Sequence, residues 1–386
     1  MVPPERQGTL FPFEGPVPPE LLIDRASELD LLARRAADRV SVRLVAPRRY
    51  GKTSLLLAHA GRLQESSWRT AHVDLSRVTD LTDVARRLGA AYAHLDAPWV
   101  RAHLSGLLAR LGVSLSPVGP AVSLGPRPMT SDPETAEAIL PRLLDLPKTL
   151  WDADRTPTLV VFDEFQDLLV ARKDLDGLLR SRIQYHADAA AYVYAGSEPS
   201  MMRELFDRRE RPLFGQADPL ALVPLPIDET LTDLAARFAV DGLDPGDALG
   251  ALVVFAAGHP QRTMLLAYLL ADRLASQASG TSQAPGTRQA PGTPQTASEV
   301  VADALVRTQP AHQALWQQLG RSERVVLAAV ADGTPPTSRA LADEHQLARG
   351  TLDAAAARLA DQGHLIRTPR GSRLVDPLLA EWLRRR

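Results

Sequence analysis

Short apolar runs alternate with longer amphipathic segments over roughly the first 225 residues of the chain. Runs rich in branched aliphatic residues predict strands at 40–45, 71–75, 159–162, 190–195 and 220–223. The segments between them carry apolar residues at helical spacing. Strands that alternate with helices in this way are typical of a parallel sheet with helices on both faces. The pattern therefore predicts an α/β core over residues 20–226.

The periodicity becomes purely helical after this core. Over residues 227–275, Leu231, Leu234 and Phe238 recur on one face of a predicted helix. We therefore expect a small helical domain to follow the sheet.

Three further segments are rich in proline, glycine or small polar residues. Residues 1–19 are proline-rich and are predicted to be disordered. Residues 276–298 contain the near repeats Gln-Ala-Pro-Gly-Thr at 283–287 and 289–293, and predict a disordered low-complexity linker. An insertion between the second and third strands contains residues 116–126, which predict a hairpin or an ordered loop.

Residues 299–386 have the order of elements of a winged helix. Helices are predicted at 322–331, 338–345 and 348–362, and two strands follow at 364–367 and 373–375. The third helix of such a module often enters the DNA major groove. Here that helix carries Asp353 and Asp361 beside Arg349 and Arg358, which suits contacts with phosphates poorly.

DNA therefore remains one of two interpretations of this C-terminal region. The better candidates for contacts with DNA are the arginines around the turn between the two strands, Arg367, Arg370 and Arg373. The other interpretation is a docking or autoinhibitory domain that binds protein.

The segment Ala46–Ser54 lies between a predicted strand and a predicted helix and contains Gly-Lys-Thr. This context is typical of a loop that holds the phosphates of ATP or GTP. Backbone N–H groups and the helix N-terminus face the phosphates, Lys52 reaches the outer ones, and the Thr53 hydroxyl is a ligand for Mg²⁺. Ala46 departs from the motif, which has glycine there. The residues assigned to the nucleotide are Pro47, Arg48, Arg49, Tyr50, Gly51, Lys52, Thr53 and Ser54.

A second motif, Leu159–Glu164, is an apolar strand that ends in two carboxylates. This form is typical of a Walker B strand. Asp163 is predicted to hold Mg²⁺, and Glu164 to orient and deprotonate the water that attacks the γ-phosphate. Because holding Mg²⁺ gives Glu164 no role, the pair predicts hydrolysis of the nucleotide in addition to binding.

Composition limits the function further. The chain has 386 residues, 45% of them hydrophobic, so it can bury more than one core. Its 44 basic and 46 acidic residues nearly balance, which predicts no strong overall attraction to nucleic acid or to anionic membranes. The absence of cysteine excludes disulfides and thiolate chemistry. No signal peptide is evident, and polar residues at 258–262 interrupt the most apolar stretch, so we expect a cytoplasmic protein without membrane partners.

Several motifs together resemble the archaeal-type ATPases, which are relatives of origin-recognition AAA+ proteins and STAND NTPases. These motifs are Pro-Arg-Arg-Tyr-Gly-Lys-Thr-Ser at 47–54, Phe-Asp-Glu-Phe-Gln at 162–166, Gly-Ser at 196–197, Gly-His-Pro at 258–260 and Val-Asp-Pro-Leu-Leu at 375–379. The resemblance implies a P-loop NTPase sheet, a helical lid at 227–275 and a C-terminal winged helix. It also implies that the nucleotide is ATP.

The resemblance implies roles for individual residues as well. Ser197 takes the place of a polar γ-phosphate sensor at the end of the fourth strand. Asp24 and Arg25 lie in the segment that borders the adenine base. Arg262 in the lid is either a second γ-phosphate sensor or a salt-bridged surface residue, and His259 is a lid contact more than a metal ligand.

The family's Gly-Arg pair is replaced here by Gly215-Gln216, which leaves the arginine finger open between Arg209 and Arg211. The sequence thus predicts a Mg²⁺-dependent ATPase that works as a nucleotide-controlled switch. The alternatives are an ATP-dependent DNA-binding protein and a protein-interaction switch that hydrolyses ATP only slowly or when it self-assembles.

Overall fold

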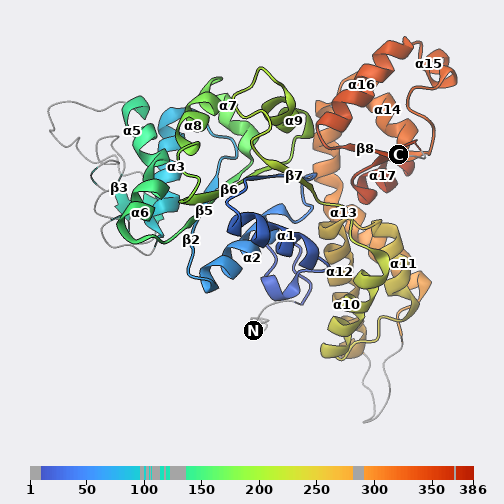
Figure 1. Ribbon diagram of the computed structural model, residues 1–386. Coiled ribbons are helices and arrows are strands. Elements are labelled where there is room, and N and C mark those ends of the chain that lie inside the picture. The colour runs from blue at the N-terminus through green and yellow to red at the C-terminus, as the bar shows by residue number, and fades with distance from the viewer. Residues whose placement is uncertain are drawn as a thin grey trace. The chain divides into compact units, whose positions relative to one another are not determined.

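The computed structural model in Figure 1 describes residues 10–95, 136–280, 291–368 and 371–386, together with positions 100, 104, 106, 114–116 and 119–121. The chain divides into two compact units, each described by itself below. The sheet unit contains Ala26–Ala46 and Leu55–Leu222. The helical unit contains the N-terminal segment up to Arg25, the loop Pro47–Ser54, and Val223–Arg386.

The sheet unit is built on five parallel strands. Their order across the sheet is β2-β5-β6-β1-β7. The strands are β1 (Val42–Val45), β2 (Arg69–Asp74), β5 (Thr158–Asp163), β6 (Ala190–Gly196) and β7 (Asp218–Ala221). All five strands predicted from the apolar runs are therefore confirmed, as is the parallel α/β fold. The inserted segment contains a short antiparallel hairpin of β3 (Ser114–Ser116) and β4 (Gly119–Ala121).

Helices cover both faces of this sheet (Figure 1). On one face lie α3 (Leu81–Ala93), α5 (Ala136–Leu144) and α8 (Leu175–Ile183), and on the other lie α1 (Ala26–Ala37) and α2 (Lys52–Glu65). The shorter helices of this unit are α6 (Leu146–Asp154), α7 (Leu168–Ala171) and α9 (Pro199–Asp207), together with the 3₁₀ turn η2 (Phe165–Asp167).

The central strands are buried on both faces, as in other parallel sheets. Every residue of β5 and β6 is buried. On the face toward α3, the rings of Phe162 and Tyr194 stack 5.9 Å apart, and the same cluster takes in Leu88 and Leu140 from the helices. This packing fixes the carboxyl ends of β5 and β6 side by side.

The helical unit contains four packed helices, which are called the lid below because they include the segment 227–275 predicted to form one. Its helices are α10 (Ile227–Val240), α11 (Gly246–Ala256), α12 (Pro260–Gly280) and α13 (Pro294–Gln318). None of the helices in the described parts of the chain combines the length and apolar character that a bilayer crossing requires.

The N-terminal segment packs onto this lid from residue 10 onward. Phe11 is 1% exposed and its ring lies 4.6 Å from that of Phe238 in α10. The buried Arg237 donates hydrogen bonds of 2.9 Å to the carbonyls of Leu10 and Leu21. The prediction of disorder was therefore wrong for residues 10–19, because two aromatic rings and a buried guanidinium anchor them. Residues 1–9 lie outside the described part of the chain.

The predicted linker at 276–298 is shorter in the structure, because helices extend into both of its ends. Residues up to Gly280 continue α12, and α13 already begins at Pro294, with Thr293 accepting a hydrogen bond from the Thr296 N–H as its N-cap. Gly292 also donates a hydrogen bond to the Asp244 carbonyl. The prediction of disorder was wrong at both ends of the segment, and residues 281–290 lie outside the described part.

The C-terminal module, residues 319–386, has the predicted order of three helices and a hairpin. Its elements are α14 (Arg321–Ala331), α15 (Arg339–His345), α16 (Arg349–Asp361), β8 (Leu365–Thr368), β9 (Gly371–Leu374) and α17 (Pro377–Arg384). Leu327, Leu352, Leu359 and Leu379 share one buried cluster. Ser338 caps α15 through the Leu341 N–H.

We expect Phe11→Ala to destabilise the protein by about 3 kcal/mol, because it removes a fully buried aromatic ring and leaves a cavity. Urea unfolding followed by circular dichroism measures the change. Val240→Ala is the matched control, since Val240 is 78% exposed on the same lid. A Phe11→Ala variant as stable as the control would contradict the packing of the N-terminal segment.

Candidate functional site

The phosphate loop lies between β1 and α2. Gly51 has φ +83°, a left-handed conformation that favours glycine, and α2 begins at the next residue, Lys52. Arg49 is left-handed as well, with φ +67°. This turn brings the chain directly into the N-terminus of a 14-residue helix, where the helix dipole and the backbone N–H groups of the first turn favour an anion.

Ala46 fits at the position where the motif has glycine. It is 2% exposed, is not among the residues with positive φ, and donates a 3.3 Å hydrogen bond to the Gly196 carbonyl of β6. An L-residue adopts this backbone without strain. The departure from the motif therefore leaves the start of the loop intact.

Lys52 and Ser54 are buried at the start of α2. The Lys52 ammonium, on a residue only 6% exposed, lies 3.5 Å from the Pro47 carbonyl at the other end of the loop. The Ser54 hydroxyl accepts a 2.9 Å hydrogen bond from the Val17 N–H. Thr53 stands between them at the first turn, where its hydroxyl can serve as an oxygen ligand.

The sheet unit places the predicted acidic pair at the carboxyl end of β5. Asp163 is 6% exposed, and its Oδ1 accepts a 3.0 Å hydrogen bond from the Glu164 N–H. Its other oxygen lies 3.5 Å from His72 Nε2 on the neighbouring strand β2. These two contacts orient the Asp163 carboxylate at the carboxyl end of β5.

Glu164 and Ser197 are brought together by the pairing of β5 with β6. The Ser197 hydroxyl donates a 2.6 Å hydrogen bond to Glu164 Oε2, and the Ser197 N–H lies 3.2 Å from the same oxygen. Sequence reasoning assigned both residues but missed a third, Gln166, whose side-chain amide donates to this oxygen at 2.7 Å. The available signal was its place two residues beyond Glu164 in the Phe-Asp-Glu-Phe-Gln motif.

The segment assigned to the adenine base has one buried and one exposed member. Arg25 is 5% exposed and donates a 2.9 Å hydrogen bond to the Val223 carbonyl, where the lid segment begins. Asp24 is exposed and has φ +43°. Arg25 therefore ties the N-terminal segment to the start of the lid.

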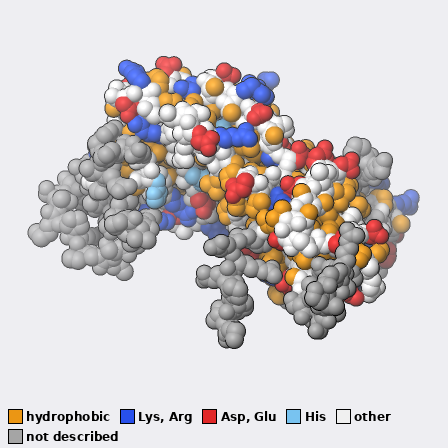
Figure 2. Space-filling model, turned by 90° about the horizontal axis from the view of Figure 1, so that it is seen from below, with side chains coloured by type: hydrophobic (Ala, Val, Ile, Leu, Met, Phe, Trp, Pro, Cys, Tyr) orange, Lys and Arg blue, Asp and Glu red, His pale blue; other side chains and the backbone are white. Residues whose placement is uncertain are grey.

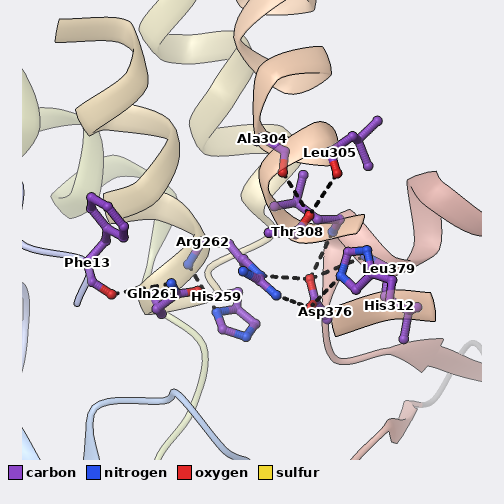
Figure 3. Close-up of polar contacts among 11 residues, drawn as sticks. Phe13, His259, Gln261, Arg262, Ala304, Leu305, Thr308, His312, Asp376 and Leu379 are labelled. Atoms are coloured by element: carbon purple, nitrogen blue, oxygen red, sulfur yellow. Dashed lines mark hydrogen bonds and ion pairs between the residues drawn. The ribbon is translucent and has the colours of Figure 1, made fainter. Parts of the chain in front are cut away.

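Arg262, the candidate sensor of the lid, forms an ion pair with the C-terminal module. Figure 3 shows Arg262 from α12 and His312 from α13 converging on Asp376, which precedes α17. Arg262 Nε donates to Asp376 Oδ1 at 2.9 Å, and its Nη2 bonds the other oxygen. Arg262 is salt-bridged, as one of the two interpretations of the sequence expected. It is only 2% exposed, however, so the expectation that it lies at the surface was wrong.

Asp376 is the acceptor for several donors at once. Its Oδ1 also accepts hydrogen bonds from the N–H groups of Leu378 and Leu379 and so caps α17. Burial would raise the pKa of Asp376, but the hydrogen bonds and the charge of Arg262, with His312 Nε2 3.5 Å from Oδ2, outweigh it and hold the pKa far below its usual value. Asp376 therefore stays ionised.

The loop itself packs against the lid within the helical unit. The Tyr50 ring lies 5.1 Å from the His259 ring, edge to face. Burial lowers the pKa of His259 to about 4, Asp376 opposes the shift, and the charges of Arg262 and Arg49 add to it. His259 is therefore neutral near pH 7 and suits the predicted role of a lid contact. Among the described residues, no group of three or more acidic or histidine side chains could hold a metal ion by itself.

Arg49 and Arg373 also lie within electrostatic reach of this cluster. The pKa of Arg49 is lowered by burial and by the charge of Arg262, while Asp376 opposes the shift. Burial raises the pKa of Tyr50, and the charge of Arg373 on β9 works against that rise. Arg373, a candidate for DNA contact from the sequence, is thus close to the phosphate loop.

The two candidates for an arginine finger differ in their surroundings. Arg211 bonds Glu204 at 2.7 Å and lies 3.5 Å from the buried carboxylate of Asp176. Arg209 is exposed. A finger supplied in trans must reach a neighbouring molecule. Of the two candidates, Arg209 is the exposed one.

Comparison of the sequence with protein families and with curated proteins gave no match. Solved structures do resemble the chain. A Walker-type ATPase of Pyrococcus abyssi has a TM-score of 0.66 at 18% identity, over 97% of this chain and 100% of that one. The ORC2 protein of Aeropyrum pernix, solved with ADPNP and ADP, has a TM-score of 0.60 at 18% identity, over 97% and 96%. Its ADP form has a TM-score of 0.52. The chain thus has the fold of these P-loop ATPases, and the resemblance inferred from the motifs is confirmed for the fold.

We expect the free energy of unfolding to decrease as the pH falls, because the unfolded chain protonates His259 before the folded protein does. Because the pKa of His259 is about 4 when folded and about 6.5 when unfolded, the unfolded chain binds more protons between these values. Stability should therefore decrease by about 2 kcal/mol from pH 7 to pH 5 through this residue. His259→Phe, which keeps a ring against Tyr50, should remove that part of the pH dependence in urea unfolding.

Val240→Ala, which changes an exposed and uncharged side chain of the lid, is the control and should leave the dependence of stability on pH unchanged. The comparison is between variants, because burial also lowers the pKa of His59 to about 4 in every one of them. Equal slopes for His259→Phe and wild type would contradict the burial of an uncharged His259.

Proposed function

We propose that this protein binds ATP together with Mg²⁺, hydrolyses it, and acts as a nucleotide-controlled switch. The observation that carries the proposal is the loop at the start of α2. Gly51 turns the chain in a left-handed conformation, and Lys52 then begins the helix with its ammonium near the loop carbonyl of Pro47. This arrangement suits the phosphates of a nucleotide, because N–H groups, a helix N-terminus and a lysine all favour negative charge there.

Hydrolysis is supported by the residues at the carboxyl ends of β5 and β6. The loop leaves the sheet after Val45, whose strand pairs with β6, and β6 pairs with β5. Thr53 and Asp163 offer the hard oxygen ligands that Mg²⁺ prefers, and the ion when bound neutralises charge on the phosphates. Glu164 accepts a proton from the attacking water at its carboxylate. Ser197 holds that carboxylate and adds a hydroxyl at the same edge.

ATP is the proposed nucleotide for a reason outside the loop. The ORC2 protein of Aeropyrum pernix, which shares the fold, was solved with the adenine nucleotides ADPNP and ADP. In this chain Asp24 and Arg25 take the place of the segment that borders the base, and Arg25 fixes that segment to the Val223 carbonyl. We therefore assign adenine recognition to this segment.

The role of a switch is supported by the ion pair between Arg262 and Asp376. Arg262 is the lid arginine proposed to sense the γ-phosphate, and its guanidinium is bound by a carboxylate of the C-terminal module. A guanidinium binds carboxylate and phosphate in the same two-pronged way. ATP would therefore compete with Asp376 for Arg262, and the outcome would set the position of the C-terminal module.

The surroundings of the C-terminal arginines favour a docking module over a DNA reader. Arg358 of α16 forms an ion pair of 2.9 Å with Glu323, and Arg349 donates to the Thr337 carbonyl. Arg373 lies near Tyr50 of the phosphate loop. Of the other wing candidates, Arg370 and the side chain of Arg367 lie outside the described part. Over the face shown in Figure 2, Lys and Arg are interspersed with Asp and Glu.

The first test compares Mg-ATP turnover of the purified protein with that of two variants. Glu164→Gln should lower turnover at least 100-fold and keep ATP binding, because it removes the base alone. Lys52→Ala should lose most ATP affinity as well. Addition of duplex DNA to the same assay tests the alternative. A rise in turnover with DNA would favour a DNA-coupled ATPase, and Lys52→Ala with normal ATP affinity would contradict the assigned phosphate site.

The second test removes the charge that competes for Arg262. Asp376→Asn keeps a side chain that can cap α17, and it should raise the affinity for a non-hydrolysable ATP analogue about tenfold by freeing the guanidinium. Calorimetry measures the affinity, and the variant should also unfold at a lower temperature because a buried arginine loses its partner. Asp343→Asn, in an exposed pair on α15, is the control. Unchanged analogue affinity in a folded Asp376→Asn variant would contradict the competition.

A further inference from the structure

We propose that Gln166 is a positioning residue for the carboxylate of Glu164, and that it sets how well Glu164 takes a proton from water. This inference rests on the proposed ATPase function. Gln166 lies on the 3₁₀ turn Phe165–Asp167 directly after β5 and is 1% exposed. It belongs to the same unit as Glu164, Ser197 and Gly196, so its contacts depend on the sheet alone.

The hydrogen bonds converge on one oxygen atom. Glu164 Oε2 accepts from the Gln166 amide at 2.7 Å, from the Ser197 hydroxyl at 2.6 Å and from the Ser197 N–H at 3.2 Å. A carboxylate oxygen has about two lone pairs, so three donors saturate it and fix the plane of the carboxylate. The three donors come from the two sides of the carboxylate, β6 and the turn after β5. The Gln166 amide is the one of these donors that does not come from Ser197.

The backbone of Glu164 is held in the same way. Its φ of 50° and ψ of 47° are left-handed, a conformation that costs a glutamate about 1 kcal/mol. Its N–H donates to Asp163 Oδ1 at 3.0 Å, and its carbonyl accepts from the Asp167 N–H at 3.0 Å. A residue kept in an unfavourable conformation by hydrogen bonds on both sides is typical of a functional position. The turn redirects the side chain toward β6.

The space for Gln166 depends on Gly196. A Cβ atom at position 196 would lie 2.6 Å from Gln166 Oε1 and 2.5 Å from Met202 Sδ. Gly196 is not among the glycines with positive φ, so the glycine is required here by space and not by conformation. The last residue of β6 is therefore matched to the side chain that holds Glu164.

A role in packing alone does not explain a glutamine at this position. Gln166 Oε1 is buried without a hydrogen-bond partner, which costs free energy that leucine or methionine of similar volume would avoid. The compensating interaction is the hydrogen bond that the Gln166 side-chain N–H donates to Glu164. A buried, half-satisfied amide in contact with the proposed base favours a role in the reaction.

The experiment measures Mg-ATP turnover and ATP affinity of the full-length protein carrying Gln166→Leu or Gln166→Met. Gln166→Leu should lower kcat about tenfold and leave KM and ATP affinity within about twofold. Gln184→Leu changes an exposed glutamine at the end of α8 in the same unit; it is the control and should behave as wild type. Thermal unfolding of each variant verifies that it is folded.

Gln166→Met separates positioning from packing. Methionine fills about the same volume as glutamine but has no N–H group for Glu164, and it removes the buried Oε1 that lacks a hydrogen-bond partner. It should therefore lower kcat as much as Gln166→Leu does, with KM unchanged and without loss of thermal stability. A residue that only fills space would leave kcat of Gln166→Met at the wild-type value.

Each outcome has one meaning. Turnover that depends on Glu164 but is unchanged in both Gln166 variants, or a kcat that rises in Gln166→Leu, overturns this inference alone. An equal absence of turnover in the wild-type protein and in Glu164→Gln overturns the proposed function, and with it this inference.

Discussion

The parallel pairing of β5, β6 and β1 is the constraint on which the rest of the candidate site depends. Parallel strands end at the same edge of a sheet, so Val45 is brought level with Gly196 and Phe162 with Tyr194. The chain continues from these ends into the phosphate loop, into Ser197 and into Asp163-Glu164. A shift of one residue in this register would turn every side chain of a strand to the other face. The burial of β5 and β6 on both faces, with stacked aromatic rings, prevents that shift.

Sequence patterns predicted these elements because their signals are local. Strand periodicity, the Gly-Lys-Thr loop and the two carboxylates after an apolar run each occupy fewer than about ten residues. The contacts that give the site its character join distant segments, and no local signal marks them. Arg262 and Asp376 are 114 residues apart, and Glu164 and Ser197 are 33 apart. The packing of Phe11 on Phe238 could not be predicted from the sequence, because these residues are also far apart along the chain. The prolines around Phe11 suggested only disorder.

Gln166 illustrates the limit most clearly. Its motif was visible in the sequence, but glutamine after a strand is ordinarily a polar residue at the surface. Its burial follows from the glycine at position 196, which opens the space beside Met202. Only when both strands are placed does the amide meet Glu164. The function of such a residue depends on tertiary packing and cannot be derived from the type of residue alone.

The charges around the loop explain why an anion would be favoured in the helical unit. The pKa values of three groups there are lowered by burial and also by neighbouring positive charges. The pKa of Arg49 is lowered by burial and then by Arg262, that of His259 by burial and then by Arg262 and Arg49, and that of His364 by burial and then by Arg48. Asp376 opposes each of these shifts without cancelling them.

A bound triphosphate would supply the negative charge that this cluster lacks. It would meet Lys52 and the N–H groups of α2 on one side, and its charge would weaken the repulsion among Arg48, Arg49 and Arg262 on the other. The triphosphate would also weaken the ion pair between Arg262 and Asp376, because the Arg262 guanidinium would share its hydrogen bonds between the phosphate and the Asp376 carboxylate. In the proposed switch, nucleotide affinity and the attachment of the C-terminal module would therefore be linked by one electrostatic balance.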